Sequence, residues 1–67
     1  MKQVNIWLPE EVTIQDAENN IYSGIVHIES GENGYVETYD GEVYLFADMD
    51  ARMLAEVEQL IEDYDEV

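Results

Sequence analysis

The chain has 67 residues, 46% of them hydrophobic, and carries a formal net charge of −15 at pH 7. Its seventeen acidic residues are balanced only by Lys2 and Arg52, which excludes direct binding to nucleic acids or anionic membranes, because both require basic side chains. The sequence has no cysteine for disulfides or thiolate metal sites, and no apolar run long enough for a signal peptide or a membrane span. These features predict one cytoplasmic domain, residues 1–67, with a small core.

The N-terminal part of the chain predicts two short strands. Residues 2–8 place an apolar side chain at every second position from Val4 to Leu8, the period of a strand with one apolar face. Pro9 has no N–H for a sheet ladder and therefore predicts the end of this strand. Residues 12–17 predict a second strand, separated from the first by a loose loop.

The middle of the chain predicts a turn at residues 18–20 and a longer strand at 21–29. Asn tolerates the left-handed backbone region that turns require. Gly24 lies inside the longer strand and predicts a bulge or a sharp bend there.

Two further hairpins follow. The pairs Asn33-Gly34 and Asp40-Gly41 are favoured in tight turns, which predicts strands at 35–39 and 42–47. With a tight turn at Asp40-Gly41, Val36 and Thr38 share a sheet face with Val43, Leu45 and Ala47. The opposite face then carries aromatic and acidic side chains: Trp7, Tyr35, Glu37, Tyr39, Glu42, Tyr44 and Phe46.

The last third of the chain predicts an amphipathic helix over about 49–65. Its apolar positions recur at helical spacing: Met53, Val57, Leu60, Ile61 and Tyr64. Asp48 or Asp50 can cap its start, because a short carboxylate accepts a bond from a free backbone N–H.

These elements predict an α+β fold. An antiparallel meander of four or five strands occupies about residues 2–47, and one C-terminal helix follows it. A nearly closed, barrel-like sheet is the alternative arrangement, with Gly24 providing the bend.

The sequence shows no catalytic or metal-binding constellation. His27 is the only histidine, and no serine or acid lies near it at a spacing that marks a catalytic triad. Asp48-Met49-Asp50 begins like a calcium loop but lacks the following glycine and the distal glutamate. We expect no enzymatic activity, no cofactor and no metal site.

Acidic side chains form two rows along the predicted helix, Glu58, Glu62 and Asp65 in one and Glu56, Asp63 and Glu66 in the other. Neighbours four residues apart are separated by ~6 Å along the helix axis. This is similar to the spacing of phosphates on a nucleic-acid strand, so the rows predict a partner-binding surface; a solvated surface is the alternative. Together with the aromatic face, the predicted partner-binding residues are Glu56, Glu58, Glu62, Asp63, Asp65, Glu66, Glu37, Glu42, Trp7 and Tyr39.

In size, acidity and helix-plus-sheet plan the chain resembles small phage-encoded nucleic-acid mimics, including anti-CRISPR and anti-restriction proteins and inhibitors of uracil-DNA glycosylase. The resemblance is one of class, carried by composition over the whole chain and by no shared motif. It implies a stoichiometric DNA-mimic inhibitor in the host cytoplasm that occupies the basic nucleic-acid-binding surface of a defence or DNA-processing protein, such as a CRISPR effector or a restriction enzyme. The alternative is an acidic protein–protein interaction or assembly module, with a homodimer through the aromatic sheet face as one form.

Overall fold

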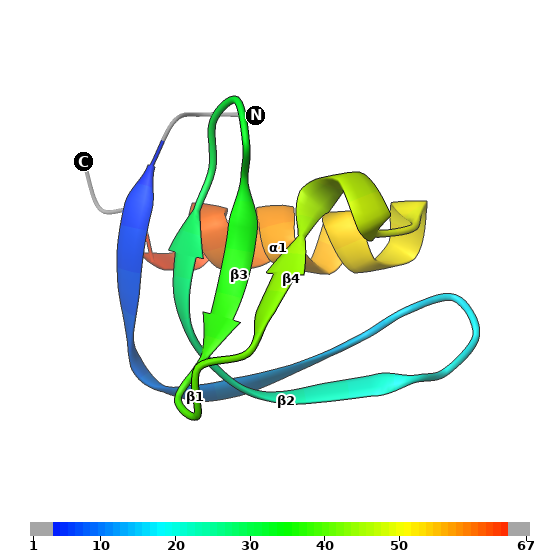
Figure 1. Cartoon of the computed structure of the whole chain (residues 1–67), viewed down its shortest axis with the longest axis horizontal. Coiled ribbons are helices and arrows are strands. Elements are labelled where there is room, and N and C mark those ends of the chain that lie inside the picture. The colour runs from blue at the N-terminus through cyan, green and yellow to red at the C-terminus, as the bar shows by residue number, and fades with distance from the viewer. Residues whose placement is uncertain (1–3, 65–67) are drawn as a thin grey trace.

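A computed structural model describes residues 4–64 and contains an antiparallel sheet followed by one α-helix (Figure 1). The elements are β1 (Asn5–Gln15), β2 (Ile21–Glu29), β3 (Tyr35–Thr38), β4 (Val43–Leu45), a 3-10 turn η1 (Phe46–Asp48) and α1 (Ala51–Tyr64). The four strands are ordered β1-β2-β3-β4, so the predicted α+β meander is confirmed and the sheet is open rather than barrel-like. No helix within residues 4–64 is long and apolar enough to cross a membrane.

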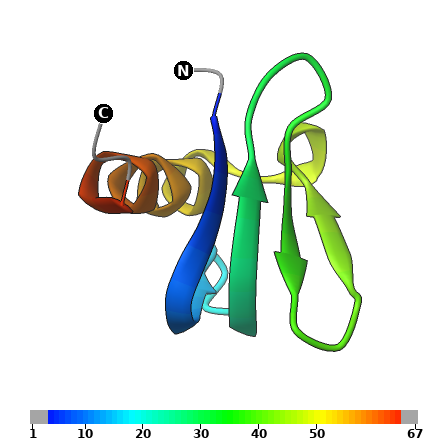
Figure 2. The same ribbon diagram turned by 90° about the vertical axis from the view of Figure 1, so that its left-hand side faces the viewer.

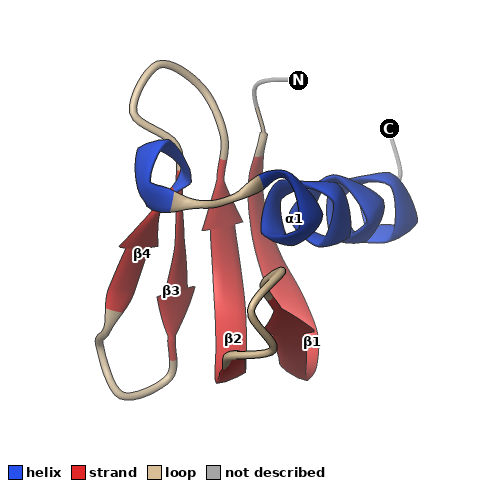
Figure 3. Cartoon of the chain, turned by 90° about the vertical axis from the view of Figure 1, so that its right-hand side faces the viewer, coloured by secondary structure: helices blue, strands red, loops and turns tan. Residues whose placement is uncertain are grey.

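The core lies between α1 and one face of the sheet. Figures 2 and 3 show the helix packed beside β1 and β2 and crossing the strand direction. The buried apolar side chains of this core are Ile6, Leu8, Ile14, Ile25, Ile28, Val36, Met53, Val57 and Ile61. The predicted apolar helix face is therefore confirmed, although Leu60 and Tyr64 are only partly buried at its margin.

β1 is one long strand, and the prediction that Pro9 ends it is wrong. The pairing register between β1 and β2 shifts between Trp7 and Val12, and Pro9 lies inside this irregular segment. β1 is also an edge strand of the sheet. Proline is tolerated at edges and bulges because no ladder bond needs its missing N–H. The two predicted N-terminal strands are thus two halves of one bent strand.

Gly24 provides the matching bend in β2, as predicted. Its φ of +76° lies in the region that favours glycine, and the register with both neighbouring strands shifts close to it. A Cβ at this position would lie 2.8 Å from Cδ1 of Tyr39, so the glycine also makes room for that ring. Beyond the bend, the distal half of the β1–β2 hairpin runs alongside α1 (Figure 1).

The β3–β4 hairpin has a different register from the one predicted. Glu37 pairs with Val43 and Val36 with Tyr44, which leaves a three-residue loop from Tyr39 to Gly41. Gly41 has a φ of +92°, as in three-residue loops that end in a left-handed residue. One extra loop residue shifts the pairing by one and turns every β4 side chain to the other face.

This register corrects the predicted faces of β4. Tyr44 packs against the core opposite Val36, and Phe46 also contacts the core from η1. Val43 and Leu45 are exposed instead. The predicted strand 42–47 accordingly ends at Leu45.

The β2–β3 connection is a five-residue loop, residues 30–34, as the bounds of the two predicted strands imply, because Glu29 pairs with Tyr35. Gly34 is required there for space, because a Cβ would collide with the ring of Phe46. The Phe46 N–H donates to the Gly34 carbonyl at 2.9 Å, which fixes η1 beneath this loop.

The start of α1 also anchors the tip of the β1–β2 hairpin. Asp50 accepts a bond from the Met53 N–H at 2.9 Å, which confirms it as the predicted cap, and its second oxygen accepts from the Ala17 N–H at 2.8 Å. Glu56 accepts from the Gln15 N–H at 2.9 Å. The bonds from Ala17 and Gln15 join segments more than thirty residues apart.

Candidate protein-binding surface

The sheet face that points away from α1, here called the outer face, carries eight side chains in two cross-strand rows. Asn5, Glu29, Tyr35 and Leu45 form one row, and Trp7, His27, Glu37 and Val43 form the other. Side chains alternate between the faces of a strand, and the row between these two packs under α1. Trp7, Val43 and Leu45 are 68%, 48% and 46% exposed, so the outer face presents apolar surface to solvent.

His27 lies at the centre of the outer face and is only 5% exposed. Its Nε2 lies 2.6 Å from Oδ1 of Asn5, whose Nδ2 donates a long bond of 3.5 Å to Glu29. A carboxylate can only accept, so the Asn5 amide nitrogen faces Glu29 and its oxygen faces His27. Nε2 therefore carries a proton and donates to Asn5.

The other imidazole nitrogen of His27 faces a carboxylate. Nδ1 is buried, makes no hydrogen bond within residues 4–64, and lies 3.4 Å from Oε1 of Glu37. The side chain of Glu37 is 35% exposed, so this imidazole nitrogen lies beside a partly solvated carboxylate.

Trp7 covers one side of this imidazole. The two rings are stacked, with centroids 4.2 Å apart and an interplanar angle of 18°, and Tyr35 approaches His27 edge-on at 5.9 Å. Because Trp7 is highly exposed although one side of its ring lies on His27, the opposite ring face is open to solvent.

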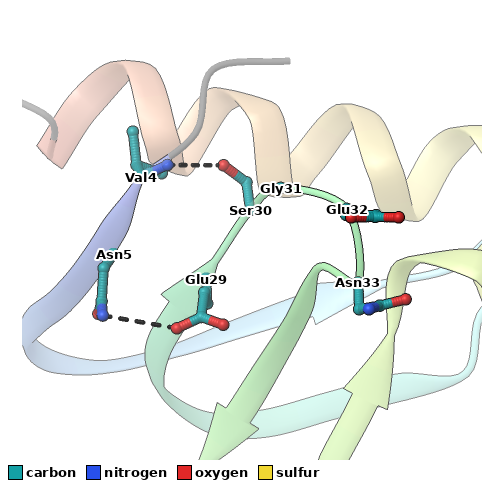
Figure 4. A pocket seen from close by; sticks show the side chains of 7 residues that line it. All are labelled: Val4, Asn5, Glu29, Ser30, Gly31, Glu32 and Asn33. Carbon is teal, nitrogen blue, oxygen red and sulfur yellow. Dashed lines mark hydrogen bonds between the residues drawn. The ribbon is translucent and has the colours of Figure 1, made fainter.

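A shallow hollow of about 480 Å³ continues from the outer face toward the β2–β3 loop (Figure 4). Asn5 and Glu29 line it from the sheet, and Glu32 and Asn33 line it from the loop. At its back, the Val4 N–H donates to the Ser30 hydroxyl at 2.9 Å. The hollow adds the Glu32 carboxylate to those of Glu29 and Glu37.

Several carboxylates are used inside the molecule. Asp50 and Glu56 hold the hairpin tip, as described above. Asp16 accepts from the N–H groups of Glu18 and Asn20 and from the side chains of Asn20 and Tyr22, and so orders the β1–β2 turn. These acids serve the fold.

Other carboxylates are exposed and take part in no hydrogen bond or ion pair within residues 4–64. They are Glu10, Glu11, Glu18, Glu32, Asp48, Glu58 and Glu62. Arg52, the only lysine or arginine in this part of the chain, donates to Oε1 of Gln15 at 3.1 Å instead of to a carboxylate. The described surface therefore has an uncompensated negative charge.

Comparisons with protein-family models, curated proteins and solved structures find no match.

Two tyrosine–carboxylate contacts alter proton affinities. The Tyr44 hydroxyl donates to Glu42 at 2.6 Å, and this bond, assisted by burial, raises the pKa of Tyr44 to about 12. Asp16 shows the opposite effect: its bonds, led by that from the Asn20 side chain, lower the pKa of Asp16 although burial opposes them. The bond to Asp16 also raises the pKa of Tyr22.

No cluster of three or more His, Asp or Glu side chains within residues 4–64 could hold a metal ion. What the outer face can do is bind: it combines an open indole ring, apolar edges and carboxylate acceptors.

The predicted partner-binding residues fall into different environments. Trp7 and Glu37 lie on the outer face, and Tyr39 is 70% exposed in the β3–β4 loop. Glu58 and Glu62 are exposed on α1, whereas Glu56 binds Gln15, Asp63 accepts from Gln59 at 3.0 Å and Glu42 binds Tyr44. Asp65 and Glu66 lie outside the described residues.

The predicted aromatic face lacked five members of the outer face: Val43, Leu45, Asn5, Glu29 and the central His27. The length of the Tyr39–Gly41 loop was the available signal for the first two, because it sets the register of β4.

Proposed function

We propose that this chain is a stoichiometric inhibitor that mimics nucleic acid and occupies a basic nucleic-acid-binding surface of another protein, such as a CRISPR effector or a restriction enzyme. The observation that carries the proposal is the outer face itself. It joins an exposed tryptophan to Glu29, Glu32 and Glu37, contains no lysine or arginine, and belongs to a chain of net charge −15. A surface of this kind complements a partner rich in arginine and lysine.

The exposed acids of α1 have a separate role in this proposal. Glu58 and Glu62 are solvent-facing and lie on the helix, on the side of the sheet opposite the outer face. Their charge extends over about a Debye length, ~8 Å at physiological salt, and attracts a basic partner before contact. They increase the association rate, whereas the outer face holds the partner.

Affinity capture from a nuclease-treated lysate tests the proposal. We expect the immobilised protein to retain nucleic-acid-binding proteins at low salt and to release them at high salt, because the attraction is electrostatic. The double variant Glu58→Lys, Glu62→Lys should associate more slowly with each captured protein and dissociate at an unchanged rate. Capture dominated by proteins without nucleic-acid-binding surfaces would contradict the proposal.

A second candidate function is that of an assembly module that forms a homodimer through the outer face. The exposure of Trp7, Val43 and Leu45 favours it, since aromatic and apolar side chains are common at the centres of interfaces. The charge opposes it, because two copies would bring Glu29 and Glu37 of each chain together without counter-charges. Sedimentation equilibrium at moderate salt separates the two functions: the inhibitor stays monomeric, and the assembly module dimerises.

A further inference from the structure

We propose that the free edge of β4 is a docking site for an extended, basic segment of a partner protein. The segment pairs with Val43 and Leu45 as a further strand of the sheet and places one aliphatic side chain beside Tyr44. A basic residue lies two positions away on either side of that aliphatic residue. The inference shares with the proposed function only the basic character of the partner, and it does not require that the partner binds nucleic acid.

The backbone of β4 directs hydrogen-bonding groups to both of its sides. The two residues that flank β4 bond toward β3 at 2.9 Å, Glu42 through its carbonyl and Phe46 through its N–H. In an antiparallel pair, residues that bond to the neighbouring strand alternate with residues that do not, so Tyr44 also bonds toward β3. The N–H groups of Val43 and Leu45 and the Val43 carbonyl therefore point to the opposite side, where residues 4–64 provide no further strand.

The two edges of the sheet differ in how they are protected. Proteins block edge strands with proline, bulges or lysine, because a free edge can pair with another chain. At the β1 edge, Pro9 lies in an irregular segment, and α1 packs beside this strand (Figure 3). In contrast, β4 keeps an unbroken register with β3, contains neither proline nor lysine, and exposes Val43 and Leu45. Of the two edges, the β4 edge is therefore the one open to a further strand.

A hollow of about 350 Å³, here called the β4 hollow, lies beside β4 on the side of the sheet that packs against α1. Besides β4 itself, its lining includes Tyr22, Met49, Met53 and the carboxylate of Asp48. Side chains of an added strand alternate between the two faces of the sheet, so the residue opposite Tyr44 lies over this hollow. Flexible methionine side chains adapt to apolar groups of different shape, which suits an aliphatic residue at this position.

The charge around the β4 edge selects the kind of segment that binds. The Asp48 side chain is exposed and makes no hydrogen bond or ion pair within residues 4–64. Glu42 is exposed at the start of β4, and Glu37 lies opposite Val43 with a side chain that is 35% exposed. Arg52, the only lysine or arginine in the described chain, donates to a glutamine instead. A basic segment complements these carboxylates, whereas a second copy of this chain adds further negative charge.

A capped peptide, Arg-Val-Leu-Val-Arg, tests the inference by NMR titration at low salt. Its palindromic sequence presents the same side chains in either strand direction. With leucine opposite Tyr44, both arginines lie on the same face as the leucine, near Glu42 at one end and Asp48 at the other. The charge-reversed peptide Glu-Val-Leu-Val-Glu should bind at least about tenfold more weakly, because like charges then meet. Equal affinities of the two peptides would overturn the basic character assigned to the segment.

The resonances of the site itself report where the peptide binds. We expect saturable shifts and slower hydrogen exchange at the amide N–H groups of Val43 and Leu45, together with shifts of the methyl groups of Met49 and Met53. Binding that leaves these signals unchanged, or the absence of a saturable shift at millimolar peptide concentration, overturns the inference.

N-methylated peptides distinguish strand pairing from side-chain contact alone. The two valines lie opposite Val43 and Leu45, so their N–H groups face β4, whereas the N–H of the central leucine points away. Methylation of both valine nitrogens should weaken binding about tenfold or more, because it removes donors and blocks close approach. Methylation of the leucine nitrogen is the matched control and should leave the affinity nearly unchanged. Equal affinities of the two methylated peptides contradict strand addition.

A variant of the protein provides the same test from the other side. Leu45 has a φ of −78°, which proline also adopts, and its N–H points away from β3, so Leu45→Pro removes a docking donor without removing a bond of the sheet. Leu45→Ala is the matched control, because it loses the side chain and keeps the N–H. With both variants folded by their amide spectra, Leu45→Pro should bind Arg-Val-Leu-Val-Arg severalfold more weakly than Leu45→Ala. Equal binding contradicts the proposed edge.

The result can be separated from that of the inhibitor proposal. If the peptide pairs with β4 but the protein leaves labelled DNA on a captured partner, the docking site is supported and inhibition by mimicry is wrong. If DNA is displaced equally well by Leu45→Pro and Leu45→Ala while the peptide leaves the β4 amide resonances unchanged, the inhibitor proposal is supported and the docking site is wrong.

Discussion

Trp7 and His27 stack across β1 and β2 with ring centroids 4.2 Å apart, on the sheet face that α1 does not cover. The contact buries a polar ring beneath an exposed aromatic one, the reverse of the arrangement that favours stability alone. On the same ring, Nδ1 of His27 lies 3.4 Å from Oε1 of Glu37. Costly arrangements of this kind are expected where a surface serves binding as well as folding.

Asp50 and Asp48 allow a comparison between a carboxylate that is hydrogen-bonded within the fold and one that is exposed. Asp50 accepts bonds from the N–H groups of Met53 and Ala17, whereas the Asp48 side chain is exposed and makes no hydrogen bond or ion pair within residues 4–64. Asp50→Ala should lower the free energy of unfolding by about 1–2 kcal/mol, as loss of a helix cap does. Asp48→Ala removes the same charge and should change it by less than about 0.5 kcal/mol. Urea unfolding of both variants checks this, and equal effects would refute the assignment.

Ile61 and Leu60 provide a corresponding pair for the core. Ile61 is 2% exposed within the core, and Leu60 lies partly exposed at its margin. Ile61→Ala should cost ~2–5 kcal/mol, which is a large fraction of the stability of so small a domain. Leu60→Ala should cost clearly less. If chemical denaturation shows a larger loss of unfolding free energy for Leu60→Ala than for Ile61→Ala, α1 must be rotated differently about its axis.

The pH dependence of the unfolding free energy should reveal how much the ionised Asp16 carboxylate contributes to stability. Its pKa is lowered in the folded state, so the unfolded chain binds this proton more readily as pH falls. Its contribution is therefore complete above its usual pKa of 3.8 and is lost as pH falls through the lower folded value. The difference in unfolding free energy between the parent and Asp16→Asn should be constant near neutral pH and should shrink below pH 3.8. A difference that grows in acid would contradict the hydrogen-bond assignment.

Tyr44 should lose its hydroxyl proton at a higher pH than an ordinary tyrosine. Its bond to Glu42 raises its pKa to about 12, and Glu42→Gln, which removes the charged acceptor, should move it back toward 10.0. Absorbance at the tyrosinate band, with Tyr44→Phe as the reference that identifies the signal, measures the shift. The folded state holds this proton more tightly, so stability falls as pH rises from 10.0 through about 12.

Most of the fold could be predicted from the sequence because its signals are local. The apolar spacing of α1, the alternation in the strands and Gly24 each depend on neighbouring residues and were confirmed. The prediction at Pro9 was wrong because a proline ends a strand only where the sheet needs a backbone N–H at that position. The irregular segment of the edge strand β1 needs none there. The predicted orientation of the β4 side chains was wrong because one additional residue in the Tyr39–Gly41 loop shifts the pairing of β4 with β3 by one position.

The site was less predictable because long-range bonds decide which acids are free. Glu56 and Glu58 look alike in sequence, yet Glu56 binds the Gln15 N–H and Glu58 faces solvent. The packing of α1 against the tip of the β1–β2 hairpin determines which of the two carboxylates is bonded and which is exposed. The position of His27 between Trp7 and Glu37 likewise depends on the pairing of β1, β2 and β3.

Competition for a captured partner tests the central claim most directly. A basic nucleic-acid-binding protein recovered with this chain is loaded with fluorescently labelled DNA and titrated with the unlabelled protein, while anisotropy and bound mass are followed together. We expect each bound protein to release DNA, the anisotropy to fall to the value of free DNA, and added DNA to raise the apparent Kd of the protein. A stable ternary complex, in which the partner holds both ligands with unchanged affinities, would contradict it.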